Sequence, residues 1–185
     1  TYVRMMSHTA PVNIGLFFHV HGRLIPTSSA CTSGSQGIGF AYEAIRFGRQ
    51  TAMIAGGSEE LDASDAAIFD TLFATSTEYN DTPGLTPRPF DTKRDGLVIG
   101  EGAGTLILEE LENARARGAK IYAEIVGFAN NTDGTHVTSP QSEQMAQCMR
   151  MSLDDARLAP EDIGYVNLHG TATDRGDAAE STAGV

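Results

Sequence analysis

The sequence has few cysteines, few basic residues and no long apolar run. Only Cys31 and Cys148 occur among 185 residues, which excludes a disulfide framework and favours a reducing, cytoplasmic location. No stretch approaches the roughly 18 apolar residues of a membrane span, and the first residues do not resemble a signal peptide. The net charge of −11 argues against a nucleic acid partner, because its phosphates would be repelled.

What remains is an alternation of strand-like and helix-like segments. Hydrophobic residues make up 41% of the chain, enough for a core of ordinary size. Short apolar runs predict strands, and apolar residues three and four apart predict helices. The expected strands are residues 24–30, 51–57, 98–109, 121–129 and 164–169, and the expected helices are residues 31–48, 63–75, 111–117 and 141–156. Such strands separated by helices indicate an α/β fold with sheets covered on both faces.

Cys31 is a candidate nucleophile, because an apolar run leads into it and a helix start rich in small residues follows. A thiol there faces backbone N–H groups and the positive end of the helix dipole, which favour the thiolate and can hold an oxyanion. Gly34, Gly37 and Gly39 would each cost a helix roughly 1 kcal/mol, so they indicate close approach of another backbone or of a substrate. The alternative is that Cys31 is a small buried hydrophobic residue.

His169 ends the strand-like run of residues 165–169 and is followed by glycine, threonine and aspartate residues. A histidine at a strand end can donate a hydrogen bond to a substrate carbonyl or transfer a proton. The alternative is a structural histidine. Cys148 lies at helical spacing among apolar residues, and we interpret it as a packing residue.

Together the two segments resemble the β-ketoacyl-acyl-carrier-protein synthases, the condensing enzymes of fatty-acid and polyketide synthesis. Four further stretches resemble this family in order and spacing: residues 55–60, 88–96, 100–104 and 133–140. Residues 28–31 and 78–83 look most like the bacterial discrete synthases of the synthase I and II group. The resemblance covers essentially the whole chain.

The resemblance implies a thiolase-like fold with α/β/α/β/α layers, incomplete in this chain. Residues 1–118 would be the later part of the N-terminal half, and residues 119–185 the start of the C-terminal half. The family's second histidine, on a Lys-x-x-x-Gly-His segment, and its Gly-Phe-Gly-Gly turn are absent from this sequence. We therefore expect residues 1–185 to be the middle of a longer domain and to be inactive in condensation when produced alone.

The reaction that the resemblance implies is a decarboxylative Claisen condensation. Cys31 would take an acyl group from a carrier-protein thioester, and a malonyl-carrier thioester would then lose CO2 and attack the acyl group, giving a 3-oxoacyl-carrier protein. His169 would stabilise the enolate. We expect no metal and no cofactor beyond the phosphopantetheine of the acyl carrier protein. The expected partners are this carrier protein and a second copy of the chain, paired through residues 24–30 in a homodimer.

Further positions carry over from the same resemblance. Thr171 and Thr173 match threonines that bind the pantetheine amides, and Thr138 would face the same tunnel; their alternative role is to satisfy the loop backbone. Phe69 lies where an acyl-pocket phenylalanine is expected, with ordinary core packing as the alternative.

Asp177 and Glu180 fall where the family pairs acidic groups with an active-site lysine. Because that lysine is absent from this sequence, the prediction is that both carboxylates are unpaired or solvated.

Two other functions remain open. A thiolase-fold acyltransferase or hydrolase acting on coenzyme A thioesters would use the same nucleophile without the malonyl step. The second function is that of a noncatalytic partner, which sets the chain length in an active synthase. Such partners usually lack the cysteine that is retained here.

Overall fold

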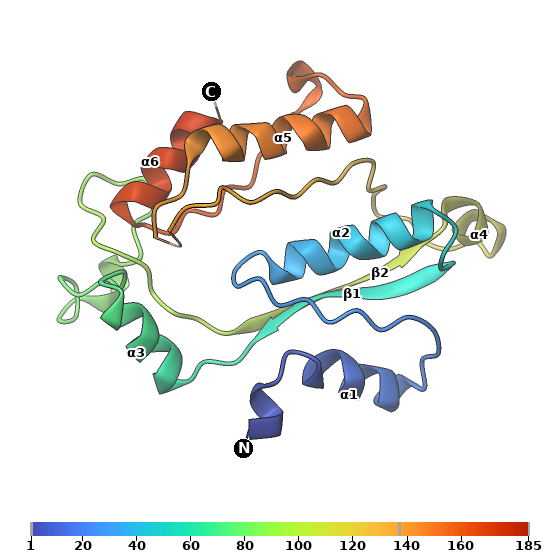
Figure 1. Ribbon diagram of the computed structural model, residues 1–185, viewed down its shortest axis with the longest axis horizontal. Helices are drawn as coiled ribbons and strands as arrows, with labels where there is room; N and C mark the ends of the chain where they lie inside the picture. The colour runs from blue at the N-terminus through green and yellow to red at the C-terminus, as the bar shows by residue number, and fades with distance from the viewer. Residues whose placement is uncertain (1, 137, 185) are drawn as a thin grey trace. The chain divides into compact units, whose positions relative to one another are not determined.

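The computed structural model describes residues 2–136 and 138–184, which form two compact units (Figure 1). The first unit comprises Thr1–Glu59 and Glu101–Ile125, and the second comprises Glu60–Gly100 and Val126–Val185. Each unit is therefore built from two separate stretches of chain. Cys31 belongs to the first unit and His169 to the second.

The first unit is a two-stranded sheet packed against a helix. Strands β1 (Ala52–Glu59) and β2 (Gly102–Glu109) pair antiparallel, with Ala52 opposite Glu109 and Glu59 opposite Gly102. Helix α2 (Ser33–Arg46) packs on this sheet through small buried residues (Figure 1). The other elements are a 3-10 helix η1 (Tyr2–Met5), α1 (Thr9–Phe18) and α4 (Leu111–Ala116).

The second unit is mostly helical. It contains α3 (Ala63–Thr71), η2 (Pro83–Leu85), α5 (Ser142–Ala156), η3 (Pro160–Asp162) and α6 (Asp174–Ala183). Helices α5 and α6 contact each other. The largest fully buried side chain among the described residues is not apolar: it is the carboxylate of Asp177, in α6. This unit therefore buries a carboxylate, which needs hydrogen-bond or ionic partners.

Three of the expected strands are wrong. Within the described residues, 24–30, 121–129 and 164–169 form no strand, whereas β1 confirms residues 51–57 and β2 confirms the later part of 98–109. Apolar composition suits a strand, but a strand forms only where a second backbone supplies the ladder. The apolar segment before α5 is held by that helix instead: Phe128 N donates to Asp155 Oδ2 at 3.0 Å, and Asn131 Nδ2 donates to the carbonyl of Gln144 at 2.8 Å.

Four helices confirm the helical predictions to within a few residues, namely α2, α3, α4 and α5. The sequence did not predict α1 or α6. Helix α1 contains a proline and a glycine and has no polar face. Helix α6 has no apolar residue larger than alanine and is started by its cap, since Thr173 Oγ1 accepts from Gly176 N at 3.2 Å. Among the described residues, none of the helices combines the length and apolar character that crossing a membrane requires.

The β1–β2 pair predicts a strong difference between two glycines. A methyl group at Gly56 would collide with the carbonyl oxygen of Gly104, whereas the same addition at Gly104 meets no described atom within 4 Å. We expect Gly56→Ala to lower the free energy of unfolding by about 1–3 kcal/mol, and Gly104→Ala by less than about 0.5 kcal/mol. Chemical denaturation measures both, and equal losses would contradict this register.

Candidate active site

Cys31 lies exposed in a tight turn just before α2. The preceding Ala30 has φ of +52°, a left-handed conformation that non-glycine residues rarely adopt. The hydroxyl of Ser33 holds the turn: it accepts from Ser29 N at 2.8 Å and donates to the carbonyl of Ala30 at 2.7 Å. Cys31 is therefore not the small buried hydrophobic residue of the alternative interpretation, and its role as the nucleophile stays a prediction.

The helix does not begin at Cys31, as the sequence predicts, but two residues later, at Ser33. Thr32 occupies the N-cap position without a side-chain cap bond, and its hydroxyl donates instead to the carbonyl of Ser29 at 2.9 Å. Local bonds of this kind compete with helix formation. Cys31 and Thr32, which the sequence predicts to be helical, belong instead to the turn that exposes the thiol.

Glycines fix the start of α2 against β1. A methyl group at Gly57 would lie 3.1 Å from Gly34 Cα, and one at Gly37 would lie 3.2 Å from the carbonyl oxygen of Gly56. For Gly34 and Gly37, the expectation that the helix glycines reflect close approach of another backbone is confirmed, and that backbone is β1. The Cys31 turn is therefore attached to a helix with little freedom to shift.

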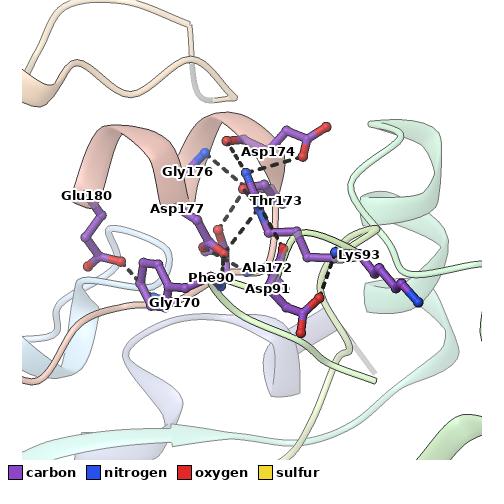
Figure 2. A network of polar contacts seen from close by, with 12 residues as sticks. Phe90, Asp91, Lys93, Gly170, Ala172, Thr173, Asp174, Gly176, Asp177 and Glu180 are labelled. Carbon is purple, nitrogen blue, oxygen red and sulfur yellow. Dashed lines mark hydrogen bonds and ion pairs between the residues drawn. The ribbon is translucent and has the colours of Figure 1, made fainter. Parts of the chain in front are cut away.

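In the second unit, two carboxylates of α6 hold the backbone of the loop that starts at His169 (Figure 2). Glu180 accepts from His169 N at 2.5 Å and from Gly170 N at 2.8 Å. Asp177 accepts from Ala172 N at 3.0 Å. The side chain of His169 is exposed. The loop's backbone is thus fixed by hydrogen bonds to α6.

The prediction that Asp177 and Glu180 are unpaired or solvated is wrong. Asp177 is only 2% exposed, and besides Ala172 N it binds Phe90 N at 2.6 Å and Arg94 Nε at 3.4 Å. The prediction considered a lysine as the only partner. The partners are instead backbone N–H groups and an arginine, which a search for a missing lysine does not find.

The threonines of this loop bond to each other. The hydroxyls of Thr171 and Thr173 lie 2.8 Å apart, and Thr173 also caps α6. The alternative role, satisfying the loop backbone, is therefore observed for Thr173. Binding of pantetheine amides stays a prediction for both.

Two further candidates lie elsewhere in the second unit. Thr138 Oγ1 is 2.9 Å from His136 Nδ1, and Thr138 N donates to the same nitrogen at 3.3 Å. Phe69 is half-buried in α3. Their contact with substrate stays a prediction.

Arg94 and Phe90 are the residues of this network that the sequence did not single out. Both lie in residues 88–96, a stretch that resembles the family but contains no candidate site residue. Five of these nine residues are charged, so charge alone does not distinguish Arg94.

Cys148 differs from Cys31 in burial. Its Sγ donates to the carbonyl of Ala129 at 3.5 Å, and burial raises the pKa of the Cys148 thiol, partly offset by the backbone N–H of Asn131. The group is therefore a protonated thiol across the neutral range.

We accordingly expect alkylation of Cys148, followed in a Cys31→Ala variant, to become efficient only at a pH above that needed for an ordinary thiol. The measurement is the rate of iodoacetamide labelling against pH, with a small free thiol as reference. Labelling of Cys148 at neutral pH as fast as the reference would contradict the burial argument.

Two family models match the chain. One, described as "Beta-ketoacyl synthase, N-terminal domain", matches residues 1–114, and the other, "Beta-ketoacyl synthase, C-terminal domain", matches residues 122–184.

Among curated proteins, the chain is 45% identical over 166 residues to 3-oxoacyl-[acyl-carrier-protein] synthase 1 of Escherichia coli K12, which covers 90% of this chain and 40% of that protein. It is 46% identical over 171 residues to 3-oxoacyl-[acyl-carrier-protein] synthase 2 of Vibrio cholerae, covering 91% of this chain and 41% of that protein. The chain thus spans about two fifths of the length of these curated relatives.

Solved structures match equally well. A beta-ketoacyl synthase from Burkholderia phymatum superposes with a TM-score of 0.96 at 63% identity, covering 98% of this chain and 44% of that one. A ketosynthase of a type II polyketide system, solved with its acyl-carrier protein, superposes with a TM-score of 0.93 at 35% identity, covering 98% and 45%. These neighbours have a thiolase-like fold and confirm the predicted fold class.

Proposed function

Because this chain belongs to the beta-ketoacyl synthase family, we propose that it carries the nucleophile and one catalytic histidine of a carrier-protein-dependent condensing enzyme. The reaction is the decarboxylative condensation of an acyl-Cys31 intermediate with malonyl-acyl carrier protein. The observation that carries this proposal is the exposed Cys31 on a turn fixed by Ser33 at the start of α2. A presented thiol on a fixed element is what covalent catalysis requires.

In the first step, the Cys31 thiolate attacks the carbonyl carbon of an acyl-carrier thioester. A C–S bond to Cys31 forms, the C–S bond to the pantetheine sulfur breaks, and the released thiolate takes up a proton. The carbonyl oxygen becomes negative in the transition state, and the backbone N–H of Cys31 is the donor that this chain offers to it.

In the second step, the malonyl group loses CO2 and the bonding electrons pass into an enolate. The enolate carbon attacks the acyl carbon, the C–S bond to Cys31 breaks, and the thiolate is regenerated. His169 donates a hydrogen bond to the enolate oxygen. The loop supports this role. Glu180 accepts hydrogen bonds from the backbone N–H groups of His169 and Gly170, and this limits the positions that the exposed imidazole can take.

For substrate binding, we propose that Thr171 and Thr173 bind the pantetheine arm together with Thr138, and that Phe69 lines the acyl pocket. The hydroxyl pair supports this role. Whichever of Thr171 and Thr173 donates across their 2.8 Å contact, one hydroxyl proton is left for an acceptor outside the pair. A pantetheine carbonyl is such an acceptor.

The acyl carrier protein is the proposed substrate carrier, and phosphopantetheine is the only prosthetic group in the reaction. We place the reaction in fatty-acid biosynthesis, with polyketide synthesis as the alternative pathway, and the protein in the cytoplasm. The junction between the two halves is proposed near Gly118, and the interval between the two family-model matches, residues 115–121, includes this position.

We also propose a homodimer in which residues 24–30 pair with the same residues of a second copy. Among the described residues, no backbone hydrogen bond involves residues 24–28. Leu24 and Ile25 are 47% and 39% exposed. A second backbone would supply the ladder that this apolar segment lacks within one copy.

The test is to supply the complete protein with acyl-acyl carrier protein and malonyl-acyl carrier protein, and in parallel with the coenzyme A thioesters. We expect 3-oxoacyl-carrier protein and one CO2 per product from the carrier substrates. Acyl transfer from coenzyme A without CO2 would favour the acyltransferase or hydrolase. Absence of product, together with an altered chain length when an active synthase is added, would favour the noncatalytic partner.

A further inference from the structure

Among the residues that the structure describes, one cation is paired with the buried carboxylate of Asp177. Removing a carboxylate from water costs several kcal/mol unless hydrogen bonds and an opposite charge compensate it. Phe90 N and Ala172 N supply two hydrogen bonds, one to each carboxylate oxygen. Arg94 is the cation paired with Asp177 among the described residues, at 3.4 Å. The buried charge therefore depends on Arg94 for its neutralisation.

Arg94 also binds backbone carbonyls of two segments, the loop that contains Phe90 and the start of α6. Its guanidinium donates to the carbonyl of Asp91 at 3.0 Å, to that of Asp174 at 3.1 Å and to that of Thr173 at 3.4 Å. The side chain is 19% exposed. A planar guanidinium with five N–H donors can serve several acceptors in fixed directions, which an ammonium cannot do. Arg94 thus joins the Phe90 loop to the first turn of α6.

The loop between His169 and α6 has a strained backbone, which contacts from other residues must stabilise. Gly170 and Ala172 have φ of +56° and +60°, and an alanine in that region costs roughly 1–2 kcal/mol. Ala172 is nevertheless completely buried, with its N–H on Asp177 (Figure 2). The start of the loop is held by Glu180, and its end is held by Asp177 and Arg94.

We propose that Arg94 is a positioning residue for His169, acting through Asp177 and the backbone of residues 172–174. It pairs with the buried carboxylate and holds the strained loop in a single conformation, and so sets the place from which the imidazole meets the enolate. This inference rests on the proposed function, because the enolate step is where misplacement of His169 is felt.

The test compares Arg94→Met, Arg94→Lys and the control Arg115→Met in the complete protein. Arg115 forms an exposed ion pair with Glu112, with a side chain 59% exposed. We expect Arg94→Met to lower malonyl decarboxylation by about 100-fold, mainly in kcat, because displacement of a catalytic group by about 1 Å has that effect. Arg94→Lys keeps the charge and should recover part of the loss, while acyl transfer to Cys31 and the Arg115→Met variant stay at the wild-type rate.

If the wild-type protein decarboxylates malonyl-carrier protein and Arg94→Met does so at the same rate, the inference about Arg94 is overturned, while the proposed function stands. Equal loss of acyl transfer and decarboxylation in both Arg94 variants would assign Arg94 a merely structural role and overturn it too. The same holds if both Arg94 variants fail to fold while Arg115→Met folds. Failure of the wild-type protein itself to decarboxylate malonyl-carrier protein would instead refute the proposed function.

Discussion

Replacing His169 with alanine in the complete protein is expected to lower malonyl decarboxylation by at least roughly 10²–10³-fold, the usual effect of losing a donor to a developing oxyanion. Acyl transfer to Cys31 should be partly retained, because the first step does not form the enolate. The two steps are measured separately, as release of labelled CO2 and as formation of acyl-enzyme. A single variant therefore assigns His169 to one step.

His21→Ala is the matched control, since His21 is an exposed histidine outside every candidate motif. It should leave both steps at the wild-type rate. If His169→Ala reduces both steps equally while thermal unfolding is unchanged, His169 does not have the separate role in the enolate step that we propose.

The second large effect concerns the nucleophile. Cys31→Ala should lower formation of 3-oxoacyl-carrier protein by roughly 10⁴–10⁶-fold, the range seen when a member of a covalent catalytic group is removed. Stability should change little, because the Cys31 side chain is exposed and the turn is held by Ser33. Product formation by mass spectrometry and thermal unfolding measure the two quantities.

Cys148→Ala is the comparison for this variant. It removes a half-buried thiol in α5 and should leave condensation intact apart from any loss of stability. A Cys31→Ala protein that still condenses, or a Cys148→Ala protein that fails to condense while remaining folded, would contradict the assignment of the nucleophile.

The helices could be predicted from the sequence because their signals are local. Helix α2 has apolar residues at helical spacing, and Gly48, just after its end, has φ of +66°. The strands could not be predicted as well, since a ladder depends on a partner elsewhere in the chain. Residues 51–57 have that partner in β2, whereas the apolar residues 121–129 pair with no strand in the part of the chain that the structure describes.

The same distinction applies to the site. Cys31 and His169 could be proposed as candidates from the residues next to them, because each stands beside a short motif. The Asp177 network could not, because Phe90 and Asp177 are 87 residues apart in sequence. A carboxylate in a polar stretch is normally solvated, and only the fold shows that this one is buried.

Backbone strain lies next to both candidate catalytic residues. Ala30, with φ of +52°, precedes Cys31, and Ala172, with φ of +60°, follows His169 by three residues. In each case nearby polar side chains hold the conformation, Ser33 in the first and Asp177 in the second. Strain of this kind persists where the surroundings fix it and is often found at functional sites. Neither alanine is distinguished by the sequence.

The most direct test of the account is to locate the acyl group in the complete protein. The protein is incubated with an acyl carrier protein bearing an isotope-labelled acyl chain, digested at low pH to preserve thioesters, and mapped by mass spectrometry. The account predicts one acyl group per chain, on the peptide that contains Cys31, and its disappearance with CO2 release when malonyl-carrier protein is added. An acyl group on Cys148, or product formation without any acyl-Cys31, would contradict it.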